Sequence, residues 1–370
     1  MDLIEYLKNK INKKGHLSFP EFMQIALYAP QGGYYSSSIR GLGAEGDFTT
    51  APEMTSLFGS AMAKQVAQVL GAVTQPTILE LGAGSGRLCI DILRQLEREG
   101  CLPQSYLILE VSAQLREQQY DRIAAEIPQL GARVKWLKEW PKEHFNGVIV
   151  ANEVLDAMPV HRFLKTTEGI LESYIRLNDK DVLEEYFLPS ENLRLISHLE
   201  GILPEAPLPY LSEANLWIDG WIKECYATLA KGAVFLLDYG FPQHEYYHPD
   251  RYMGTLMCHY QHRAHTDPLL YIGQQDITAH VDFTHVATAA DLAGFHIAGY
   301  THQAAFLLGC DLLTLFNDIQ DPSARFREQA AVKQLLQSSE MGELFKVMAL
   351  TKELNEPLRG FQFYDKRASL

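Results

Sequence analysis

Ile78-Leu79-Glu80-Leu81-Gly82-Ala83-Gly84-Ser85-Gly86 decides the fold of this 370-residue chain. A short apolar run ends in a turn with glycine at every second position, and an amphipathic segment follows, which together predict a strand, a tight turn and a helix. Glycine permits positive φ and carries no side chain, so the main chain can approach a ligand closely beside the unpaired N–H groups of the helix start. The stretch predicts a ligand-binding turn, with a tight turn that binds nothing as the alternative.

The glycine spacing argues against a dinucleotide site. The fingerprint G-x-G-x-x-G needs a third glycine at a fixed position, which is Arg87 when counted from Gly82 and Cys89 when counted from Gly84. The observed E-x-G-x-G-x-G pattern, beginning at Glu80, instead resembles the first motif of class I methyltransferases. In that motif the acidic residue orients the ammonium-bearing portion of S-adenosyl-L-methionine, the cofactor that this resemblance implies.

Short apolar runs alternate with amphipathic segments along much of the chain. This alternation predicts a parallel sheet with crossover helices, which is the α/β class. We expect a seven-strand, Rossmann-like sheet of the class I methyltransferase type, with N-terminal helices and inserted regions. The seven expected strands lie at 77–81, 105–110, 133–137, 147–151, 232–238, 296–301 and 345–351.

Four segments are expected along the chain. They are an N-terminal helical region with a cofactor-covering loop at 1–75, the first half of the core at 76–159, an insertion at 160–210, and the second half of the core at 211–370, which contains an inserted lid at 239–283.

Smaller patterns give those segments local structure. Ser18 to Glu21 form a capping box that starts a helix through Tyr28, and Pro52 begins a helix that continues toward Leu70. The first insertion begins as a hairpin, with strands at 162–164 and 171–176. The lid is rich in His, Tyr, Gly and Asp and lacks clear periodicity, which predicts a long functional loop.

Composition restricts the partners and the location. A formal net charge of −14 argues against a nonspecific grip on nucleic-acid phosphates. Five cysteines without a CxxC pair predict neither a disulfide framework nor a thiolate zinc site. The segment from Met1 to Lys10 lacks a long apolar stretch, so we expect no membrane insertion and a cytoplasmic location. The oligomeric state stays open.

Polar residues follow two of the expected strands. Glu110 closes the strand at 105–110, where doubly wound folds place a carboxylate that accepts both ribose hydroxyls, although it could instead cap the helix beginning near Ser112. Asn152, Glu153 and Asp156 follow the strand at 147–151, where a methyl acceptor should arrive. The alternative for Glu153 and Asp156 is that they cap a short helix.

Histidines are concentrated in the expected lid. Imidazole and thiolate are common zinc ligands, but the group lacks a matching second ligand pair or an HExxH helix, so we expect no metal. His280, flanked by Asp276 and Asp282, is the better candidate for a general base, with a hydrogen-bonded structural histidine as the equal alternative. The concentrated residues are His244, His248, Cys258, His259, His262 and His265.

Several motifs, in this order, together resemble the MidA family. The resemblance spans nearly the whole chain, and the family includes a mitochondrial complex I assembly factor that methylates an arginine. The motifs are GDFTTAPE at 46–53 with LFG at 57–59, the glycine turn, EVS at 110–112 with LR at 115–116, NEVLDAMP at 152–159, and DITAHVDF at 276–283.

The resemblance implies roles for individual residues. The segment from Asp47 to Glu53 would cover the pocket, and Glu153 would meet the acceptor. Because a pair of carboxylates can orient a guanidinium and help remove its proton, we expect Asp156 or Asp282 to be the second acid. The catalytic candidates are therefore Glu153, Asp156, His280 and Asp282. The candidates for binding the cofactor are Asp47, Thr50, Pro52, Glu80, Gly82, Gly84, Gly86, Glu110 and Asn152.

We therefore expect an S-adenosyl-L-methionine-dependent methyltransferase that acts on an arginine of a protein substrate. Two alternatives remain. A small-molecule methyltransferase would have a closed apolar acceptor pocket. A non-catalytic assembly or binding factor would keep the fold without the reaction, because fold alone does not settle function.

Overall fold

The computed structural model describes residues 2–37, 50–203, 205 and 208–370. The chain separates into two compact units. We call the first the insertion unit; it contains Met1–Phe48, Leu155–Ile218 and Phe241–Thr284. We call the second the core unit; it contains Thr49–Val154, Asp219–Gly240 and His285–Leu370.

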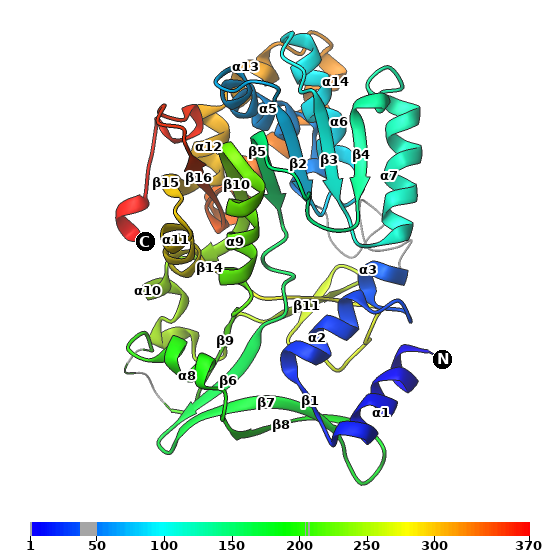
Figure 1. Ribbon diagram of the computed structural model, residues 1–370, viewed down its shortest axis with the longest axis vertical. Coiled ribbons are helices and arrows are strands. Elements are labelled where there is room, and N and C mark those ends of the chain that lie inside the picture. Colours follow the sequence, from blue (N-terminus) through cyan, green and yellow to red (C-terminus); the bar gives the residue numbers. More distant parts are fainter. Residues whose placement is uncertain (1, 38–49, 204, 206–207) are drawn as a thin grey trace. The chain divides into compact units, whose positions relative to one another are not determined.

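A mostly parallel sheet organises the core unit, with strand order β15-β16-β10-β5-β2-β3-β4 (Figure 1). The pairs β10/β5, β5/β2, β2/β3 and β3/β4 are parallel, whereas β16 runs antiparallel between β15 and β10. All seven strands expected from the sequence are present, which confirms the fold class. They are β2 (Thr77–Leu81), β3 (Ser105–Leu109), β4 (Val134–Leu137), β5 (Phe145–Asn152), β10 (Leu229–Phe241), β15 (His296–His302) and β16 (Phe345–Lys352).

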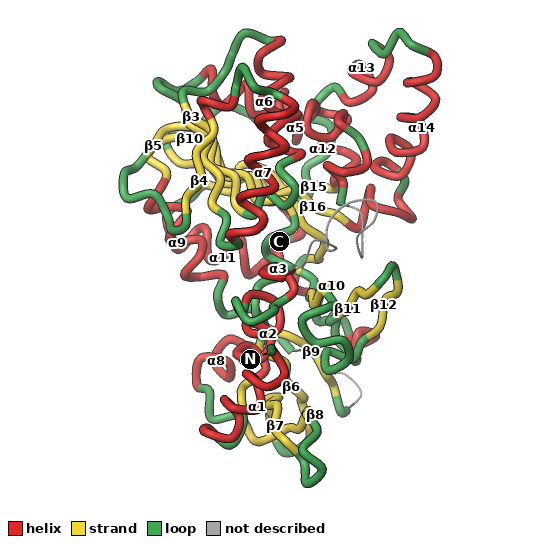
Figure 2. The backbone as a smooth tube through the Cα atoms, turned by 90° about the vertical axis from the view of Figure 1, so that its right-hand side faces the viewer, coloured by secondary structure: helices red, strands yellow, loops and turns green. Residues whose placement is uncertain are grey.

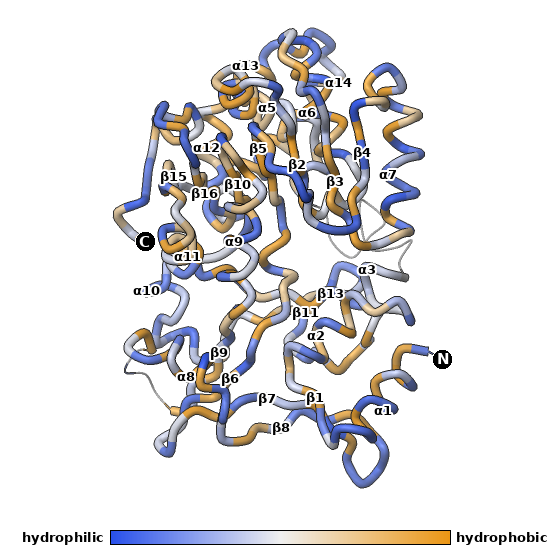
Figure 3. The backbone as a smooth tube through the Cα atoms, viewed as in Figure 1, coloured by the Kyte–Doolittle hydropathy of each residue, from blue (hydrophilic) through white to orange (hydrophobic). Residues whose placement is uncertain are grey.

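The central strands are apolar on both faces, because helices cover both faces of a parallel sheet. Every residue of β2 is buried, and Figure 3 shows the hydrophobic colouring along β2, β3 and β5. Ile78 packs with Phe58 and Ile90 of α5 (Ser56–Gly71) and α6 (Arg87–Arg98) in one cluster. The neighbouring residue Leu79 points to the opposite face, where Figure 2 shows α9 (Ile218–Thr228) and α11 (Phe283–Ala293).

The expected helix from Pro52 toward Leu70 is broken in two. Thr55 adopts extended backbone angles (φ −160°, ψ 140°), and its hydroxyl accepts the N–H of Leu57 at 3.0 Å as the N-cap of α5. A residue that is extended and caps a new helix cannot continue the previous one. The remaining helical elements of the core unit are α4 (Ala51–Met54), α7 (Ala113–Glu126), η1 (Gly131–Arg133), α12 (Gln303–Gly309), α13 (Leu312–Asn317), α14 (Pro322–Leu336), η3 (Ser338–Gly342), η4 (Arg359–Phe361) and η5 (Arg367–Ser369).

Two antiparallel sheets form the strands of the insertion unit. The larger has the order β1-β7-β6-β9, with β8 paired to β7, and the expected hairpin is its β6/β7 pair. The smaller has the order β12-β11-β13 and lies in the segment 239–283, so part of the expected long loop is a small sheet. The strands of these two sheets are β1 (Leu17–Ser18), β6 (His161–Thr166), β7 (Gly169–Leu177), β8 (Leu183–Pro189), β9 (Tyr210–Ala214), β11 (Met257–Tyr260), β12 (Arg263–His265) and β13 (Asp276–Thr278). The short strand β14 (Val281–Asp282) pairs instead with β10.

The N-terminal helices supply one core of the insertion unit. Leu7 and Phe22 are fully buried and cluster with Ile175 of β7. The expected capping box is present. The Ser18 N–H donates to the Glu21 carboxylate at 3.1 Å, and the Ser18 side chain accepts the backbone N–H of Glu21, the third residue of the helix. The helical elements are α1 (Leu3–Lys14), α2 (Phe19–Tyr28), α3 (Tyr34–Ser37), α8 (Leu193–Leu199), α10 (Gln243–Tyr246) and η2 (Pro249–Arg251).

Membrane-spanning helices require a long apolar stretch of about 20 residues. Within the described ranges, none of the helices combines the length and the apolar character needed to cross a bilayer.

Two glycines of α5 provide a matched test of helix packing. A Cβ on Gly59 would lie 2.6 Å from the Cβ of Asp91 in α6, whereas a Cβ on Gly71 would meet nothing within 4 Å. We expect Gly59→Ala to lower the free energy of unfolding by about 1–3 kcal/mol, because α5 and α6 must separate to relieve the overlap. Gly71→Ala should leave that free energy unchanged or raise it by up to about 1 kcal/mol. Urea denaturation measures both, and equal effects would contradict the close approach.

Candidate functional site

The carboxyl ends of three parallel strands lie at one edge of the core-unit sheet. Leu81 at the end of β2 pairs with Leu109 of β3 and with Ala151 of β5. Ligands of open α/β sheets bind outside this edge, where the chain leaves the strands. The residues that follow the three paired positions are Gly82, Glu110 and Asn152.

The turn after β2 has the backbone that its glycines predict. Gly82, Gly84 and Gly86 have φ values of 64°, 52° and 81°. A Cβ on Gly82 would lie 3.3 Å from Val154, and one on Gly86 would lie 3.4 Å from Gln119. Residues other than glycine would therefore be strained in this turn. Helix α6 begins immediately after it. The turn fits a ligand that needs close main-chain approach and helix N–H groups, as the adenosyl cofactor does.

Glu53 links a preceding segment to this turn. Its carboxylate accepts the hydroxyl of Ser85, and Arg122 Nη1 donates to Ser85 Oγ at 2.6 Å and to Glu53 Oε1 at 3.1 Å. Thr50 is the N-cap of α4 and Pro52 lies in its first turn, so both are held near the turn by Glu53. Asp47, the remaining predicted residue of this segment, lies outside the described residues.

Glu80 is a buried carboxyl at the end of β2. Its side chain is 2% exposed, and Tyr106 donates its hydroxyl to Glu80 Oε2 at 2.8 Å. Burial raises the pKa of Glu80 to about 7; the Tyr106 hydrogen bond lowers it and the nearby Glu110 raises it. A ligand cation at this edge would favour the charged form of Glu80.

Glu110 is fixed by main-chain and side-chain donors. Its Oε1 accepts the N–H of Ser112 at 2.9 Å, and its Oε2 accepts Nε2 of Gln119 at 3.3 Å. The cap of α7 is Ser112 itself, whose Oγ accepts the N–H of Leu115 at 3.3 Å. Burial raises the pKa of Glu110, while the bonds from Ser112 and Gln119 lower it. The carboxylate stands at the strand end where doubly wound folds bind ribose.

The turn after β5 is strained and held by a buried acid. Glu153 has φ of 53°, which costs a residue other than glycine on the order of 1 kcal/mol. Asn152 donates to Glu153 Oε1 at 3.1 Å. Asp238, 1% exposed and three residues before the end of β10, accepts the N–H of Val154 at 3.2 Å and that of Tyr239 at 2.9 Å. These bonds support the unusual backbone that presents Glu153.

The other three catalytic candidates belong to the insertion unit. The carbonyl of Asp156 accepts the N–H of Ala279 at 3.0 Å, so its backbone lies beside the segment that carries His280. The ring of His280 packs on Phe241 with centroids 5.3 Å apart. Asp282 Oδ1 accepts the N–H of Thr284 at 3.0 Å at the start of α11. These contacts are structural, and they leave the catalytic roles of Asp156, His280 and Asp282 as predictions.

The histidines of the segment 239–283 do not converge. Among the residues that the structure describes, no three or more His, Cys, Asp or Glu side chains are grouped so that they could hold a metal ion. His248 and His265 instead accept main-chain N–H groups two residues further on, from Asp250 at 3.2 Å and Asp267 at 3.3 Å.

Three polar residues of the site were not predicted. Asp238 follows a long apolar run, the same signal that identified Glu110, and it could have been found from that signal. Tyr106 lies inside β3 and Gln119 lies in α7 among other polar residues, so neither stands out in the sequence. Their partners are 26 and 35 residues away, at Glu80 and Gly84 respectively.

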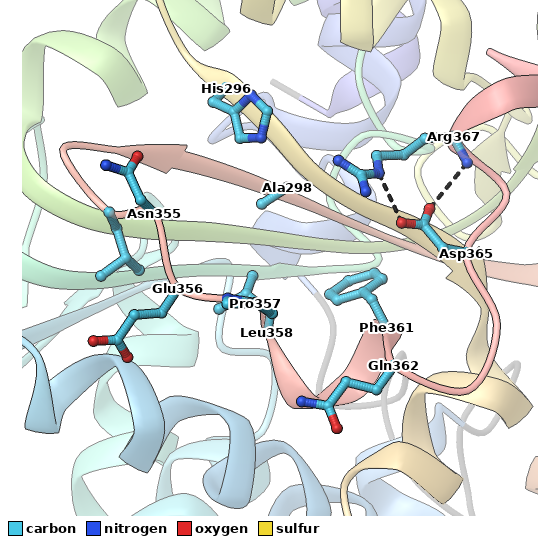
Figure 4. Close-up of a pocket in the computed structure, with 11 residues that line it drawn as sticks. His296, Ala298, Asn355, Glu356, Pro357, Leu358, Phe361, Gln362, Asp365 and Arg367 are labelled. Atoms are coloured by element: carbon cyan, nitrogen blue, oxygen red, sulfur yellow. Dashed lines mark hydrogen bonds and ion pairs between the residues drawn. The ribbon is translucent and has the colours of Figure 1, made fainter.

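A shallow pocket of about 300 Å³ lies elsewhere in the core unit (Figure 4). His296 on its wall pairs with Thr351 of β16, and the register continues through Ala233 and Val148 to Ile78, near the start of β2. The glycine turn follows the other end of β2, so the pocket lies at the opposite edge of the sheet. It is lined by His296, Ala298, Leu354, Asn355, Glu356, Pro357, Leu358, Phe361, Gln362, Asp365 and Arg367.

The raised pKa of Glu80 predicts a pH dependence of stability. The ordinary pKa is 4.5 and the folded value is about 7, so the folded state binds the extra proton. The stabilisation is fully present below about pH 4.5 and is lost as the pH rises through about 7, by roughly 3 kcal/mol. Glu80→Gln should remove this loss, whereas Glu117→Gln on the exposed side of α7 should keep it. Urea denaturation between these pH values measures the difference; parallel curves for the protein and Glu80→Gln would contradict it.

Comparisons with known proteins agree with this geometry. A family model for S-adenosyl-L-methionine-dependent methyltransferases matches residues 61–301. Protein arginine methyltransferase NDUFAF7, mitochondrial, from Bos taurus is 30% identical over 390 residues, covering 94% of this chain and 83% of that protein. The Homo sapiens protein of that name is 28% identical over 388 residues, covering 94% of this chain and 83% of that protein.

A solved structure adds the cofactor product. A Burkholderia thailandensis protein crystallised with bound S-adenosyl-homocysteine is 40% identical, with a TM-score of 0.95 over 100% of this chain and 96% of that chain.

The expected cytoplasmic location is wrong. The bovine and human relatives are mitochondrial proteins by name, which contradicts it, and the lack of an apolar stretch near the N-terminus was no basis for choosing a compartment. The family, the fold and the cofactor inferred from the motifs are instead confirmed. The chain belongs to the MidA-like family of S-adenosyl-L-methionine-dependent methyltransferases.

Proposed function

We propose that this chain transfers the methyl group of S-adenosyl-L-methionine to an arginine side chain of a protein. The acceptor is carried over from relatives that are named protein arginine methyltransferases. The observation on this chain that supports it most is Glu153. Glu153 is the first residue after β5 and has a positive φ. It lies at the same edge of the sheet as the start of the glycine turn, so its carboxylate is placed near the proposed cofactor seat.

The proposed cofactor seat consists of the turn from Gly82 to Gly86 and the carboxylate of Glu110. The turn offers close main-chain approach and the start of α6, and Glu110 accepts hydrogen bonds from the ribose hydroxyls. Glu80 supplies buried negative charge for the ammonium-bearing portion, with Thr50, Pro52 and Asn152 as further contacts. The positive φ values and the buried, donor-fixed Glu110 support this seat.

A carboxylate suits the proposed acceptor. A guanidinium has a pKa above about 12 and delocalised lone pairs, so it is a poor nucleophile until it is oriented and loses a proton. When bound, the cofactor supplies a methyl group on a sulfonium sulfur, which departs as a neutral thioether. Glu153 accepts hydrogen bonds from the guanidinium, directs one terminal nitrogen and favours loss of its proton as the C–N bond forms.

Labelled methyl transfer tests the acceptor. The protein is incubated with methyl-labelled S-adenosyl-L-methionine and cell extract, and the labelled residue is identified by mass spectrometry. We expect methylarginine in a protein. Label on lysine or on a carboxylate would overturn the arginine assignment, and label in a small metabolite alone would show a small-molecule methyltransferase.

Glu153→Gln separates chemistry from cofactor binding. Because the amide keeps the shape but loses the charge that favours proton loss, we expect methyl transfer to fall by about 100-fold or more. The dissociation constant of S-adenosyl-L-homocysteine should stay within about twofold of that of the unmodified protein. Glu143→Gln, on the exposed loop before β5, is the control and should change neither quantity. Full activity of Glu153→Gln would remove Glu153 from the reaction.

Glu110→Gln tests the ribose contact. Loss of charge-assisted hydrogen bonds should weaken S-adenosyl-L-homocysteine binding by about 10-fold to 100-fold, measured by calorimetry. Glu117→Gln in α7 removes an exposed acid and serves as the control. An unchanged dissociation constant for Glu110→Gln would exclude Glu110 from the seat.

A further inference from the structure

Gln119 is a fully buried glutamine in α7, at 0% exposure. Its side chain makes three hydrogen bonds to groups from three different parts of the core unit. Nε2 donates to the carbonyl of Gly84 at 2.8 Å and to Glu110 Oε2 at 3.3 Å. Oε1 accepts Nε1 of Trp136, in β4, at 2.9 Å. One amide group therefore joins the glycine turn, the end of β3 and the edge strand.

Chemistry fixes which way the amide faces. The indole nitrogen of Trp136 can only donate, so the atom of Gln119 opposite it must be the oxygen. The two hydrogens of Nε2 are then directed at the two acceptors, the Gly84 carbonyl and the Glu110 carboxylate. All the hydrogen-bonding capacity of the amide nitrogen is used, and none of it is available to a ligand.

The side chain also sets the spacing of the turn. A Cβ on Gly86 would lie 3.4 Å from Cγ and 3.6 Å from Cα of Gln119, so the stem of Gln119 lies directly against the turn. Trp136 is held in turn by the ring of Tyr120, with centroids 5.8 Å apart. Gln119 is thus supported on its far side while it contacts both parts of the proposed cofactor seat.

We propose that Gln119 is a positioning residue for S-adenosyl-L-methionine: it locks the Gly84 carbonyl and the Glu110 carboxylate in the arrangement that receives the cofactor, without touching the cofactor itself. The proposal rests on the cofactor seat given above. Its physical basis is preorganisation, since a carboxylate that is already oriented loses less entropy when the ribose binds. The same hydrogen bond lowers the pKa of Glu110 against the effect of burial, because a donor to the ionised form favours that form.

Gln119→Leu tests the proposal against a matched control. Gln65, in α5, is also 0% exposed, donates to Gln68 at 3.0 Å and accepts from the Gly360 N–H at 3.0 Å, so Gln65→Leu makes the same chemical change away from the seat. We expect Gln119→Leu to raise the dissociation constant of S-adenosyl-L-homocysteine by about tenfold or more. Gln65→Leu should change it by less than about twofold even where it lowers stability as much. Equal effects on binding would overturn the positioning role.

Gln119→Glu distinguishes orientation from space filling. Glutamate has nearly the shape of glutamine, so a residue that only fills space should tolerate it better than leucine. If Gln119 acts as a positioning donor, Gln119→Glu should bind S-adenosyl-L-homocysteine more weakly than Gln119→Leu at about pH 8. The new carboxylate would face the Gly84 carbonyl and repel Glu110. The other charges that act on Glu110, those of Arg116 and Glu80, are the same in both variants. Tighter binding by Gln119→Glu than by Gln119→Leu would contradict the proposal.

A double-mutant cycle separates this proposal from the seat on which it rests. If Gln119 acts through Glu110, the effect of Gln119→Leu on the dissociation constant should shrink by about threefold or more when Glu110→Gln is already present. Unchanged binding by Glu110→Gln alone would mean that the seat is wrong. Weakened binding by Glu110→Gln with none by Gln119→Leu would keep the seat and overturn the role of Gln119.

Discussion

The parallel pairing of β2 with β3 and β5 is the constraint from which the site follows. Leu81 is level with Leu109 and Ala151, so the chain leaves all three strands at the same edge of the sheet. Because parallel strands all point the same way, each must leave by a turn at that edge and return by a helix. The pairing of the strands thereby brings their turns together, and no contact between the side chains of the turns is needed for this. Polar residues that follow these strands therefore lie close together because the strands are paired in register.

Carboxyl groups at this edge are buried at a cost that the fold offsets with donors. Glu80, Glu110 and Asp238 are each no more than 5% exposed. Their donors come from Tyr106, from main-chain N–H groups and from Gln119, and burial still raises the pKa of both glutamates. An apolar replacement would avoid the desolvation cost, so the acids are not there for stability. A charge in a low-dielectric site acts strongly on a cationic ligand. The cofactor carries two cationic groups, its sulfonium and its ammonium.

The sequence predicted those parts of the structure that depend on local pattern. The strands were found because a central parallel strand such as β2 is a continuous apolar run with glycine at its end. The break at Thr55 was missed because threonine and serine also occur inside helices, and only the backbone shows the cap. The small sheet of β11, β12 and β13 was missed because its short strands show little alternation. Gln119 was missed because a contact across 35 residues leaves no local pattern in a polar helix.

The strain at Glu153 is informative about what the edge does. A positive φ at a residue with a side chain persists only where neighbouring contacts compensate for it, and here Asp238 accepts the next N–H while Asn152 contacts the Glu153 carboxylate. Glycine would satisfy the same backbone without strain, as it does three times in the turn after β2. At that turn the proposed role belongs to the main chain, which would contact the cofactor directly, and a side chain would obstruct that contact. After β5 the side chain is retained despite the backbone cost, and this retention supports the proposal that the Glu153 carboxylate acts on the acceptor.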